Sequence, residues 1–356
     1  MLDAAFLVRR QAPGLLLSGL CYAGGLAFGL AVSAVLLVQA GVPAAALVDE
    51  FLIATFLTSD GLAQTVTAAL PLVLVGLASA VAMRVRFWNI GVEGQLWLGA
   101  VASTWIGLGG TGPDALRLPA MLLLSAAIGA AWIAIPLVLK LRFGVSEVIS
   151  TLLLGSVAFL LVQHLLFGVW RDPATGFPVT AAFLEAARFP SLGWGQLHGG
   201  LFVVGIVAVL VWFMLGHTRA GFYADAVGLN PKAARAAGLP ATATVVGLVL
   251  LSGALSGLAG MTIVAGTEHR LNQSVGSGYL FSAIVIAYLA GARPFWVVVV
   301  ALALGAVFTA GSVLKVFYGI SEGMIVLVQG TVLISILMAQ FFGTYSLSRP
   351  GRGEAS

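Results

Sequence analysis

The sequence predicts an all-α integral membrane protein of about ten transmembrane helices, with both termini in the cytoplasm. Three observations support this fold class. Charged residues make up 8% of the 356 residues and the mean hydropathy is +1.08, whereas a soluble domain carries about 25% charged residues. Ten stretches between consecutive charged residues reach at least 20 residues, which is the length that a membrane helix needs. The basic residues are also unevenly divided between the two sides of these stretches.

Each of the ten stretches contains an apolar segment long enough to span. Two of them are marginal and rich in Gly and Ser, namely Glu93 to Asp114 and Arg270 to Arg293, so short, broken or re-entrant helices are expected there. The first apolar run, Gly14–Val38, is longer than the core of a cleaved signal peptide and is kept as a helix. The stretches run between Arg10 and Asp49, Asp60 and Arg84, Glu93 and Asp114, Arg117 and Lys140, Glu147 and Arg171, Arg188 and Arg219, Arg235 and Glu268, Arg270 and Arg293, Arg293 and Lys315, and Glu322 and Arg349.

The positive charges orient the chain. With the N-terminus in the cytoplasm, twelve Lys and Arg residues lie inside and five outside, and the reverse orientation would invert this bias. We therefore expect both termini inside. The inside residues are Arg9, Arg10, Arg84, Arg86, Lys140, Arg142, Arg219, Lys232, Arg235, Arg293, Arg349 and Arg352, and the outside residues are Arg117, Arg171, Arg188, Arg270 and Lys315.

Two connections are longer than the others. Residues 170–199 form an external loop whose prolines argue against a regular helix. Residues 217–242 form a cytoplasmic loop. Neither is large enough for a catalytic domain, so residues 1–356 are expected to form a single transmembrane domain.

The search for catalytic and metal motifs is negative. The sequence has no GxxxxGK[ST] phosphate loop, no HExxH and no GxSxG, and its one cysteine, Cys21, excludes an internal disulfide framework. No run of basic residues resembles a nucleic-acid surface. We therefore expect no catalytic residue, no metal ligand and no cofactor in this chain, and no nucleic-acid partner.

The segment from Arg86 to Gln95 carries polar residues into an apolar run. Asn89, Glu93 and Gln95 precede a stretch with no further charge before Asp114. A carboxylate inside a membrane costs about 2.5–3.5 kcal/mol on insertion scales, so it usually faces protein or a cavity. The alternative is that Glu93 only stabilises the first turn of its own helix. Glycines at 91 and 94 permit a close backbone approach or a broken helix.

A second polar segment begins another helix. Ser146 is a suitable N-cap and Glu147 suits the first turn. Ser150 and Thr151 have two open interpretations: they bond back to their own helix, or they line a polar path between helices.

The cytoplasmic loop contains a short predicted helix. Asn230 is a good N-cap, Pro231 suits the first helical position, and Gly238 is a stop signal. The residues between them, Lys232–Ala237, favour a helix of about two turns. So short a helix is marginal in water, and its alanine face buries little area on lipid. We therefore expect it to pack in a groove of a partner protein.

A stripe of small residues follows at 251–260, with serines at 252 and 256 and glycines at 253, 257 and 260. Small residues at this spacing let membrane helices approach closely. The stripe is interpreted as packing and not as a site.

Together these segments resemble the permeases of ribose, branched-chain amino acid and nucleoside ABC importers, over roughly residues 60–345. The NIG-x-EGQ segment at 89–95 is the most specific match, and Glu147–Leu152 fits the family's Glu-[Val/Ile]-Ile-Ser-Thr-Leu segment. The pattern G-x-N-P-x-A-A-R-x-x-G matches 228–238. Gly155 departs from the family, which commonly carries Asn there, and 278–287 is only loosely related.

The resemblance implies roles and partners. It implies that the short helix couples to a separate ATPase, which binds ATP and Mg²⁺, so the chain itself is not an enzyme. It also implies a second permease, expected to be a different chain, and an external lipoprotein binding protein. The expected coupling residues are Gly228, Asn230, Pro231, Lys232, Ala233, Ala234, Arg235 and Gly238, and the expected residues of the translocation path or gate are Asn89, Gly91, Glu93, Gln95, Glu147, Ser150 and Thr151.

The expected function is ATP-driven import of a small polar solute across a bacterial inner membrane. Nucleosides are the expected class of solute. A ribose-type sugar permease is the alternative within the family. A gradient-driven secondary transporter and a membrane enzyme are the alternatives outside it. The first would often carry acids within its spans, and here Glu93 and Glu147 lie at span edges. The second would need a convergent catalytic set, which is not visible.

Overall fold

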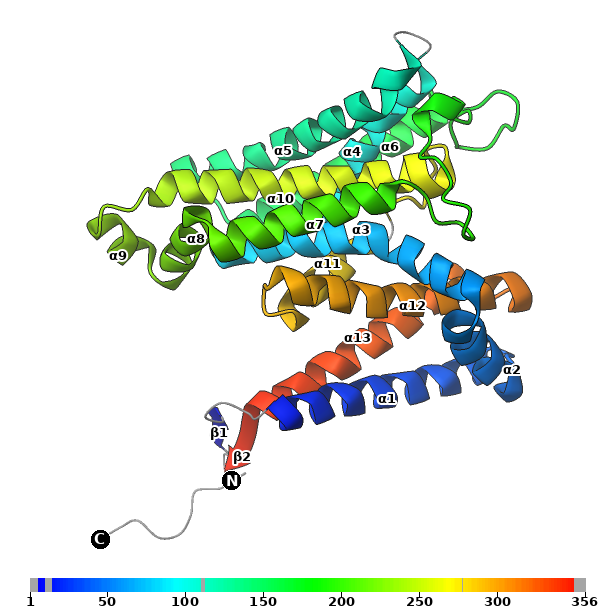
Figure 1. Ribbon diagram of the computed structural model, residues 1–356, viewed down its shortest axis with the longest axis horizontal. Coiled ribbons are helices and arrows are strands. Elements are labelled where there is room, and N and C mark those ends of the chain that lie inside the picture. The colour runs from blue at the N-terminus through cyan, green and yellow to red at the C-terminus, as the bar shows by residue number, and fades with distance from the viewer. Residues whose placement is uncertain (1–5, 10–14, 110–112, 277, 349–356) are drawn as a thin grey trace. The chain divides into compact units, whose positions relative to one another are not determined.

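The computed structural model describes residues 6–9, 15–109, 113–276 and 278–348, which form two compact units (Figure 1). We call Thr55–Thr309 the large unit, and Met1–Ala54 with Ala310–Ser356 the small unit. Arg10, Arg349 and Arg352, which contributed to the orientation count, lie outside the described residues. The expectation of a single transmembrane domain stays a prediction.

Helices dominate both units. The large unit contains α3 (Ser59–Arg84), α4 (Val92–Leu108), η2 (Asp114–Leu116), α5 (Arg117–Phe143), α6 (Glu147–Phe167), η3 (Glu185–Ala187), α7 (Gly200–His217), α8 (Arg219–Leu229), α9 (Pro231–Ala236), α10 (Ala241–Ile263), η4 (Val264–Glu268), α11 (Tyr279–Leu289) and most of α12 (Pro294–Tyr318). The small unit contains β1 (Phe6–Arg9), α1 (Leu15–Gln39), α2 (Ala44–Val48), α13 (Glu322–Thr344) and β2 (Tyr345–Ser348), and η1 (Asp49–Leu57) leads from it to the large unit.

The described helices confirm an integral membrane protein. Seven of them are long and apolar enough to cross a membrane: α3, α5 with η2, α6, α7, α10 with η4, α12 and α13. Each of the ten charge-free stretches holds at least one helix, the first of them both α1 and α2. The two marginal stretches hold short helices, of 17 residues in α4 and 11 in α11. Ten crossings and the inside location of both termini stay predictions.

Helix α10 lies at the centre of the large unit and packs against α3, α4 and α5. The small-residue stripe makes the contacts with α4 and α5, as predicted. A Cβ on Gly257 would lie 2.1 Å from the carbonyl oxygen of Ser125, and a Cβ on Gly260 would lie 2.0 Å from that of Leu96. Because backbone meets backbone at these points, no larger side chain fits there.

The small unit pairs the two ends of the described chain. α1 packs along α13, and β1 and β2 form an antiparallel ribbon in which Phe6 is opposite Ser348 (Figure 1). Gly25 of α1 permits this packing, because a Cβ there would lie 2.8 Å from the carbonyl oxygen of Ser335. The all-α prediction missed the ribbon, since each strand has only four residues and takes its pairing from the other end of the chain.

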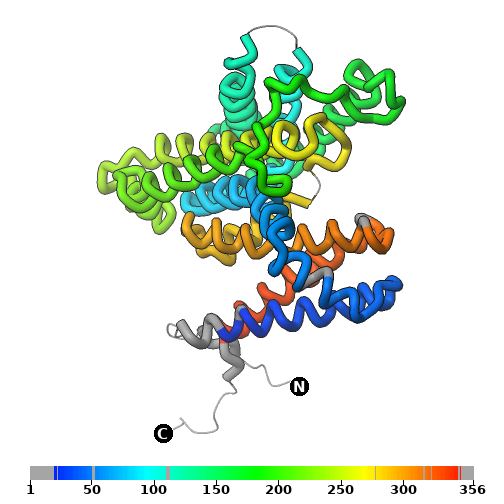
Figure 2. The backbone as a smooth tube through the Cα atoms, turned by 45° about the vertical axis from the view of Figure 1, so that its right-hand side comes forward, coloured from blue at the N-terminus to red at the C-terminus, as the bar shows by residue number. Residues whose placement is uncertain are grey.

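Different segments of the chain contact each other at the two ends of the large unit, and Figure 2 traces their backbone. We call one the Arg84 end, where α3 and α11 terminate: the Arg84 Nε donates to the carbonyl oxygen of Ala292 at 3.3 Å. We call the other the Trp194 end, where α3 begins: the Trp194 indole N–H donates to the Ser59 hydroxyl at 2.7 Å.

The loop at 170–199 covers the Trp194 end and is irregular, as its prolines predicted, apart from the short turn η3. Its backbone runs beside residues 265–271: the N–H groups of Phe189, Phe183 and Thr180 donate to the carbonyl oxygens of Ala265, His269 and Leu271 at 2.9, 2.8 and 3.0 Å. Phe183 is 1% exposed and its ring packs on Gly107 of α4. The loop is therefore a fixed part of the unit.

Candidate functional site

Helix α9 forms where the loop sequence predicted it. The Asn230 side chain accepts the backbone N–H groups of Lys232 and Ala233 at 3.0 and 3.1 Å, and Pro231 occupies the first turn. Gly238 follows the helix at φ +77°, a left-handed conformation that favours glycine. The short helix is confirmed, and its role in coupling stays a prediction.

Helix α8, which precedes α9, is fixed to the end of α3. Arg84 Nη1 pairs with Asp225 at 3.2 Å, and Arg86 donates to the carbonyl oxygen of Leu229 at 3.1 Å. Gly228 lies against the backbone, since a Cβ there would be 2.1 Å from the Arg84 carbonyl oxygen. The loop at 217–242 therefore rests on the same segment that leads into Asn89.

The sequence analysis did not predict α8. Two signals were present: Thr218, whose hydroxyl accepts the Ala220 N–H at 3.2 Å and caps the helix, and three small or apolar residues at intervals of three, Gly221, Ala224 and Val227, which are buried. They were hard to recognise because α8 has no long apolar stripe and packs on other parts of the chain, namely α7, α10 and the end of α3.

The α8–α9 surface that faces away from the chain combines apolar and basic side chains. Phe222 is 64% and Leu229 77% exposed, and Lys232 and Arg235 are exposed as well. Ala234, by contrast, is 4% exposed and packs inside the chain. Of the expected coupling residues, Lys232 and Arg235 are thus exposed and accessible to a partner protein. Ala234 is buried and contributes to the packing of α9 within the chain.

Asn89 and Gln95 form a closed hydrogen-bond network, which we call the amide lock together with Ser252 of α10. Asn89 donates to the Gln95 Oε1 at 2.9 Å and to the Ser252 hydroxyl at 3.0 Å. Its own Oδ1 accepts from Gln95 Nε2 at 2.9 Å and from the Gly91 N–H at 3.1 Å. Both amides are at most 4% exposed. Because all four hydrogen-bonding positions of Asn89 are occupied, the lock joins α4 to α10 and leaves Asn89 no position for a solute.

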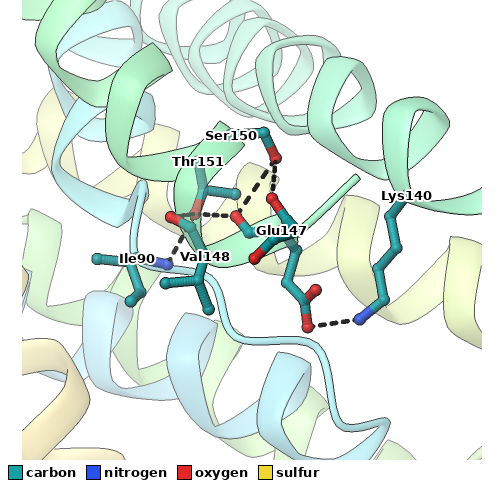
Figure 3. A network of polar contacts seen from close by, with 7 residues as sticks. Ile90, Lys140, Glu147, Val148, Ser150 and Thr151 are labelled. Carbon is teal, nitrogen blue, oxygen red and sulfur yellow. Dashed lines mark hydrogen bonds and ion pairs between the residues drawn. The ribbon is translucent and has the colours of Figure 1, made fainter. Parts of the chain in front are cut away.

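The start of α6 lies beside this segment (Figure 3). The Thr151 hydroxyl donates to the Glu147 carbonyl oxygen at 2.6 Å and accepts the Ile90 N–H at 3.2 Å, and Ser150 also bonds back to its own helix. The Glu147 carboxylate pairs with Lys140 at 2.5 Å. The structure therefore brings the two predicted path segments together, with these hydroxyls bonded to backbone.

Glu93 differs from its neighbours in the motif. It lies in the first turn of α4, is half-buried, and takes part in none of the described ion pairs. Its carboxylate faces the backbone N–H of Leu280 at the beginning of α11 and the indole of Trp97, one turn further along α4. Trp97 is 1% exposed, and its indole N–H faces the Glu93 carboxylate.

A cavity of about 260 Å³ opens at the Trp194 end. It lies between the loop at 170–199 and η4, and its lining includes Phe189, His198, Thr267 and His269. The His198 ring stacks on Phe189 at a centroid distance of 5.5 Å, and its Nδ1 accepts the Gly200 N–H at 3.2 Å. Within the described residues no group of three His, Cys, Asp or Glu side chains is placed to hold a metal ion.

The fold lowers the pKa of both imidazoles at this cavity. Burial, and then the nearby His269, lowers the pKa of His198 to about 4. Burial and the Arg188 guanidinium lower the pKa of His269. Removing a charged imidazole from water is unfavourable, so this end of the unit resists protonation. The sequence showed only scattered histidines, because His198 and His269 are brought together by the fold.

The comparison with protein families identifies the chain. A family model described as the permease component of the branched-chain amino acid transport system matches residues 61–337. The chain belongs to this permease family. The match includes the amide lock, Glu93, the start of α6 and the α8–α9 loop.

Three curated relatives of this permease are ABC transporter subunits. It is 33% identical over 327 residues to the glucose ABC transporter permease protein TsgB13 of Haloferax volcanii, which covers 89% of this chain and 86% of the relative. It is 35% identical to the guanosine ABC transporter permease protein NupP of Bacillus subtilis, over 68% of this chain and 71% of the relative. It is 27% identical to the nucleoside ABC transporter permease protein NupB of Lactococcus lactis, over 77% and 79%. No solved structure matches.

These findings establish the class of protein. The chain is a multi-pass membrane permease of an ABC transporter for a small polar solute, and its homologues are permease subunits that are not enzymes themselves. ATP hydrolysis lies in a separate subunit, which makes an ATPase a necessary partner. A gradient-driven transporter is not supported.

Proposed function

We propose that this permease, paired with a second permease of different sequence, imports nucleosides across a bacterial inner membrane. A cytoplasmic ATPase supplies the energy and an external lipoprotein delivers the solute. The observation that carries the choice of solute is the similarity to NupP and NupB, whose names state guanosine and nucleosides. The similarity to TsgB13, named for glucose, favours a simple sugar as the second candidate.

Ten crossings with both termini inside are part of this proposal. Segments expected on one side make contact with one another: Arg84 with Asp225, and Arg86 with Leu229. Segments expected on the other side do the same, as Trp194 with Ser59 illustrates. The β1–β2 ribbon brings both ends of the described chain together, which supports an even number of crossings.

The α8–α9 loop is proposed to couple the permease to its ATPase. Its outer surface carries the exposed side chains Phe222, Leu229, Lys232 and Arg235, which suit an apolar groove with acids at its rim. Its inner surface rests on the segment of Arg84 and Arg86. A displacement of α9 is thus transmitted through α8 and the end of α3 to the first residues of α4.

Uptake of labelled adenosine, glucose and ribose tests the proposal. Cells with and without this gene are compared, with the partner ATPase either intact or disabled by a catalytic mutation. Adenosine uptake that needs both genes supports the nucleoside importer. ATPase-dependent uptake of a sugar alone replaces the solute and keeps the mechanism, whereas uptake that persists without the ATPase contradicts the whole proposal.

A further inference from the structure

One side chain joins three other segments at the Arg84 end of the large unit (Figure 1). The Arg84 Nε donates to the carbonyl oxygen of Ala292, in the turn between α11 and α12, at 3.3 Å. Its Nη1 donates to the carbonyl oxygen of Leu215, near the end of α7, at 3.5 Å and to the Asp225 carboxylate of α8 at 3.2 Å. The Arg84 side chain is only 16% exposed, so it lies between these segments and not in solvent.

The planar guanidinium makes these contacts dependent on one another. Nε and Nη1 belong to one rigid group, so Arg84 cannot follow a displacement of α8 without also moving the donor that binds Ala292. A lysine ammonium is a point charge on a flexible stem and does not impose this geometry. The α8–α9 loop and the α11–α12 turn are therefore linked through the guanidinium.

The turn that Arg84 binds has an unfavourable backbone conformation. Ala292 has φ +55°, in the left-handed region that residues with a Cβ rarely adopt. Its N–H donates to the carbonyl oxygen of Ala287 at 2.9 Å, and its own carbonyl oxygen accepts from Arg84. A conformation of this kind persists where the surrounding contacts hold it. Loss of the hydrogen bond from Arg84 therefore removes one of the contacts that keep the turn in place.

Helix α11 connects this turn to the predicted path. It packs along α3, where Ile286 lies on Gly76. At its beginning, the Leu280 N–H faces the Glu93 carboxylate of α4. With 11 residues, α11 is about 16 Å long, so the turn and Glu93 lie at opposite ends of one short helix. A displacement of the turn therefore also moves the end of α11 that contacts Glu93.

We propose that Arg84 is a positioning residue for energy coupling, whose guanidinium transmits a displacement of the α8–α9 loop to the α11–α12 turn and, through α11, to Glu93. This inference rests on the proposed function, in which the α8–α9 loop contacts the ATPase. It adds a second route of transmission beside the one that leads to the first residues of α4. The second route ends at a different helix and depends on a single side chain.

The test measures the amount of adenosine imported for each ATP hydrolysed, in proteoliposomes that contain the complete transporter and its binding protein. Arg84→Lys keeps the positive charge and loses the planar group. We expect import per ATP to fall roughly tenfold, as for one lost hydrogen bond to a charged group, while ATP hydrolysis continues. Arg142→Lys makes the same change at an exposed position at the end of α5 and should keep the wild-type ratio.

A second variant tests the turn. Ala292→Pro replaces φ +55° by a value of about −65° and removes the N–H that bonds Ala287. We expect import per ATP to fall as in Arg84→Lys, and to fall no further in the double variant, because both changes break the same connection. The thermal midpoint of each purified complex identifies a variant that does not fold. If Ala292→Pro does not fold, Arg84→Lys decides the proposal alone.

An unchanged ratio in Arg84→Lys overturns the proposal. A fall of import and ATP hydrolysis by the same factor also overturns it, because a purely structural role gives that result. A double variant whose loss is the product of the two single losses contradicts a shared connection. If the wild type imports glucose and not adenosine, the nucleoside proposal fails separately, and the same variants then decide the role of Arg84 by glucose imported per ATP.

Discussion

The two faces of α4 differ in how completely their polar groups are used. Towards α10, Asn89 and Gln95 bond each other and Ser252, and glycine backbones meet at 99 and 257. Towards α11, the Glu93 carboxylate is half-buried, takes part in none of the described ion pairs, and faces the Leu280 N–H and the Trp97 indole. The polar residues of one motif thus divide into a closed amide network that joins two helices and a carboxylate that lies outside this network.

The largest effect is expected from breaking the α4–α10 contact. Gly260→Val places a side chain 2.0 Å from the Leu96 carbonyl oxygen, and because backbone cannot yield as a side chain can, we expect a loss of about 3 kcal/mol or more. Gly205→Val on α7 is the control, since no atom lies within 4 Å of a Cβ there. Recovery of monodisperse complex should collapse for the first and stay normal for the second.

The amide lock is expected to show non-additive stability. Asn89→Leu or Gln95→Leu alone leaves a buried amide with lost partners, which costs about 1–3 kcal/mol. The double variant removes both amides, so it should cost less than the sum of the single changes. Thermal unfolding of the three variants measures this coupling, and strict additivity would contradict the lock.

A smaller effect, dependent on pH, is expected at the Trp194 end. The pKa of His198 falls from 6.5 to about 4 on folding, so the unfolded chain binds more protons than the folded one between these values. Stability contributed by the neutral imidazole is complete above pH 6.5 and is lost as the pH falls towards 4. From pH 7 to pH 5 we expect a loss on the order of 1–2 kcal/mol.

The thermal midpoint at the two pH values measures this loss. His198→Gln should reduce the acid sensitivity. His164→Gln, at an exposed position on α6, should keep it. Equal acid sensitivity in wild type and His198→Gln would remove His198 as its cause.

The smallest effect is expected at the ion pair between α3 and α8. Asp225 is 62% exposed in its pair with Arg84, and exposed pairs contribute little because solvent screens them. Asp225→Asn should change the free energy of unfolding by less than about 0.5 kcal/mol. Gly228→Ala, which meets the Arg84 carbonyl oxygen at 2.1 Å, should destabilise the same contact more. A larger loss of stability in Asp225→Asn than in Gly228→Ala would show that the ion pair, and not the close backbone packing, holds α8 against α3.

What the sequence could predict depended on local information. The apolar segments, the caps of α9 and the small-residue stripe depend on neighbours a few residues apart. The caps and the stripe are confirmed, and seven of the described helices are long and apolar enough to cross a membrane. The shortness of α11 also followed from its composition.

The contacts that distinguish the polar residues depend on distant parts of the chain. Asn89 and Ser252 are 163 residues apart, so no spacing rule indicates that they bond. The Leu280 N–H that faces Glu93 and the pairing of β1 with β2 are equally remote. The prediction therefore grouped Asn89, Glu93 and Gln95 as one path, whereas the fold gives them different surroundings.

The most direct test of this division compares Gln95→Leu with Glu93→Gln in two assays, the thermal midpoint of the purified complex and the uptake of adenosine. The account predicts that Gln95→Leu lowers the thermal midpoint, while Glu93→Gln keeps the midpoint and loses uptake at normal membrane levels of the protein. A normal midpoint in Gln95→Leu, or a Glu93→Gln variant whose uptake falls only in proportion to its stability, would contradict it.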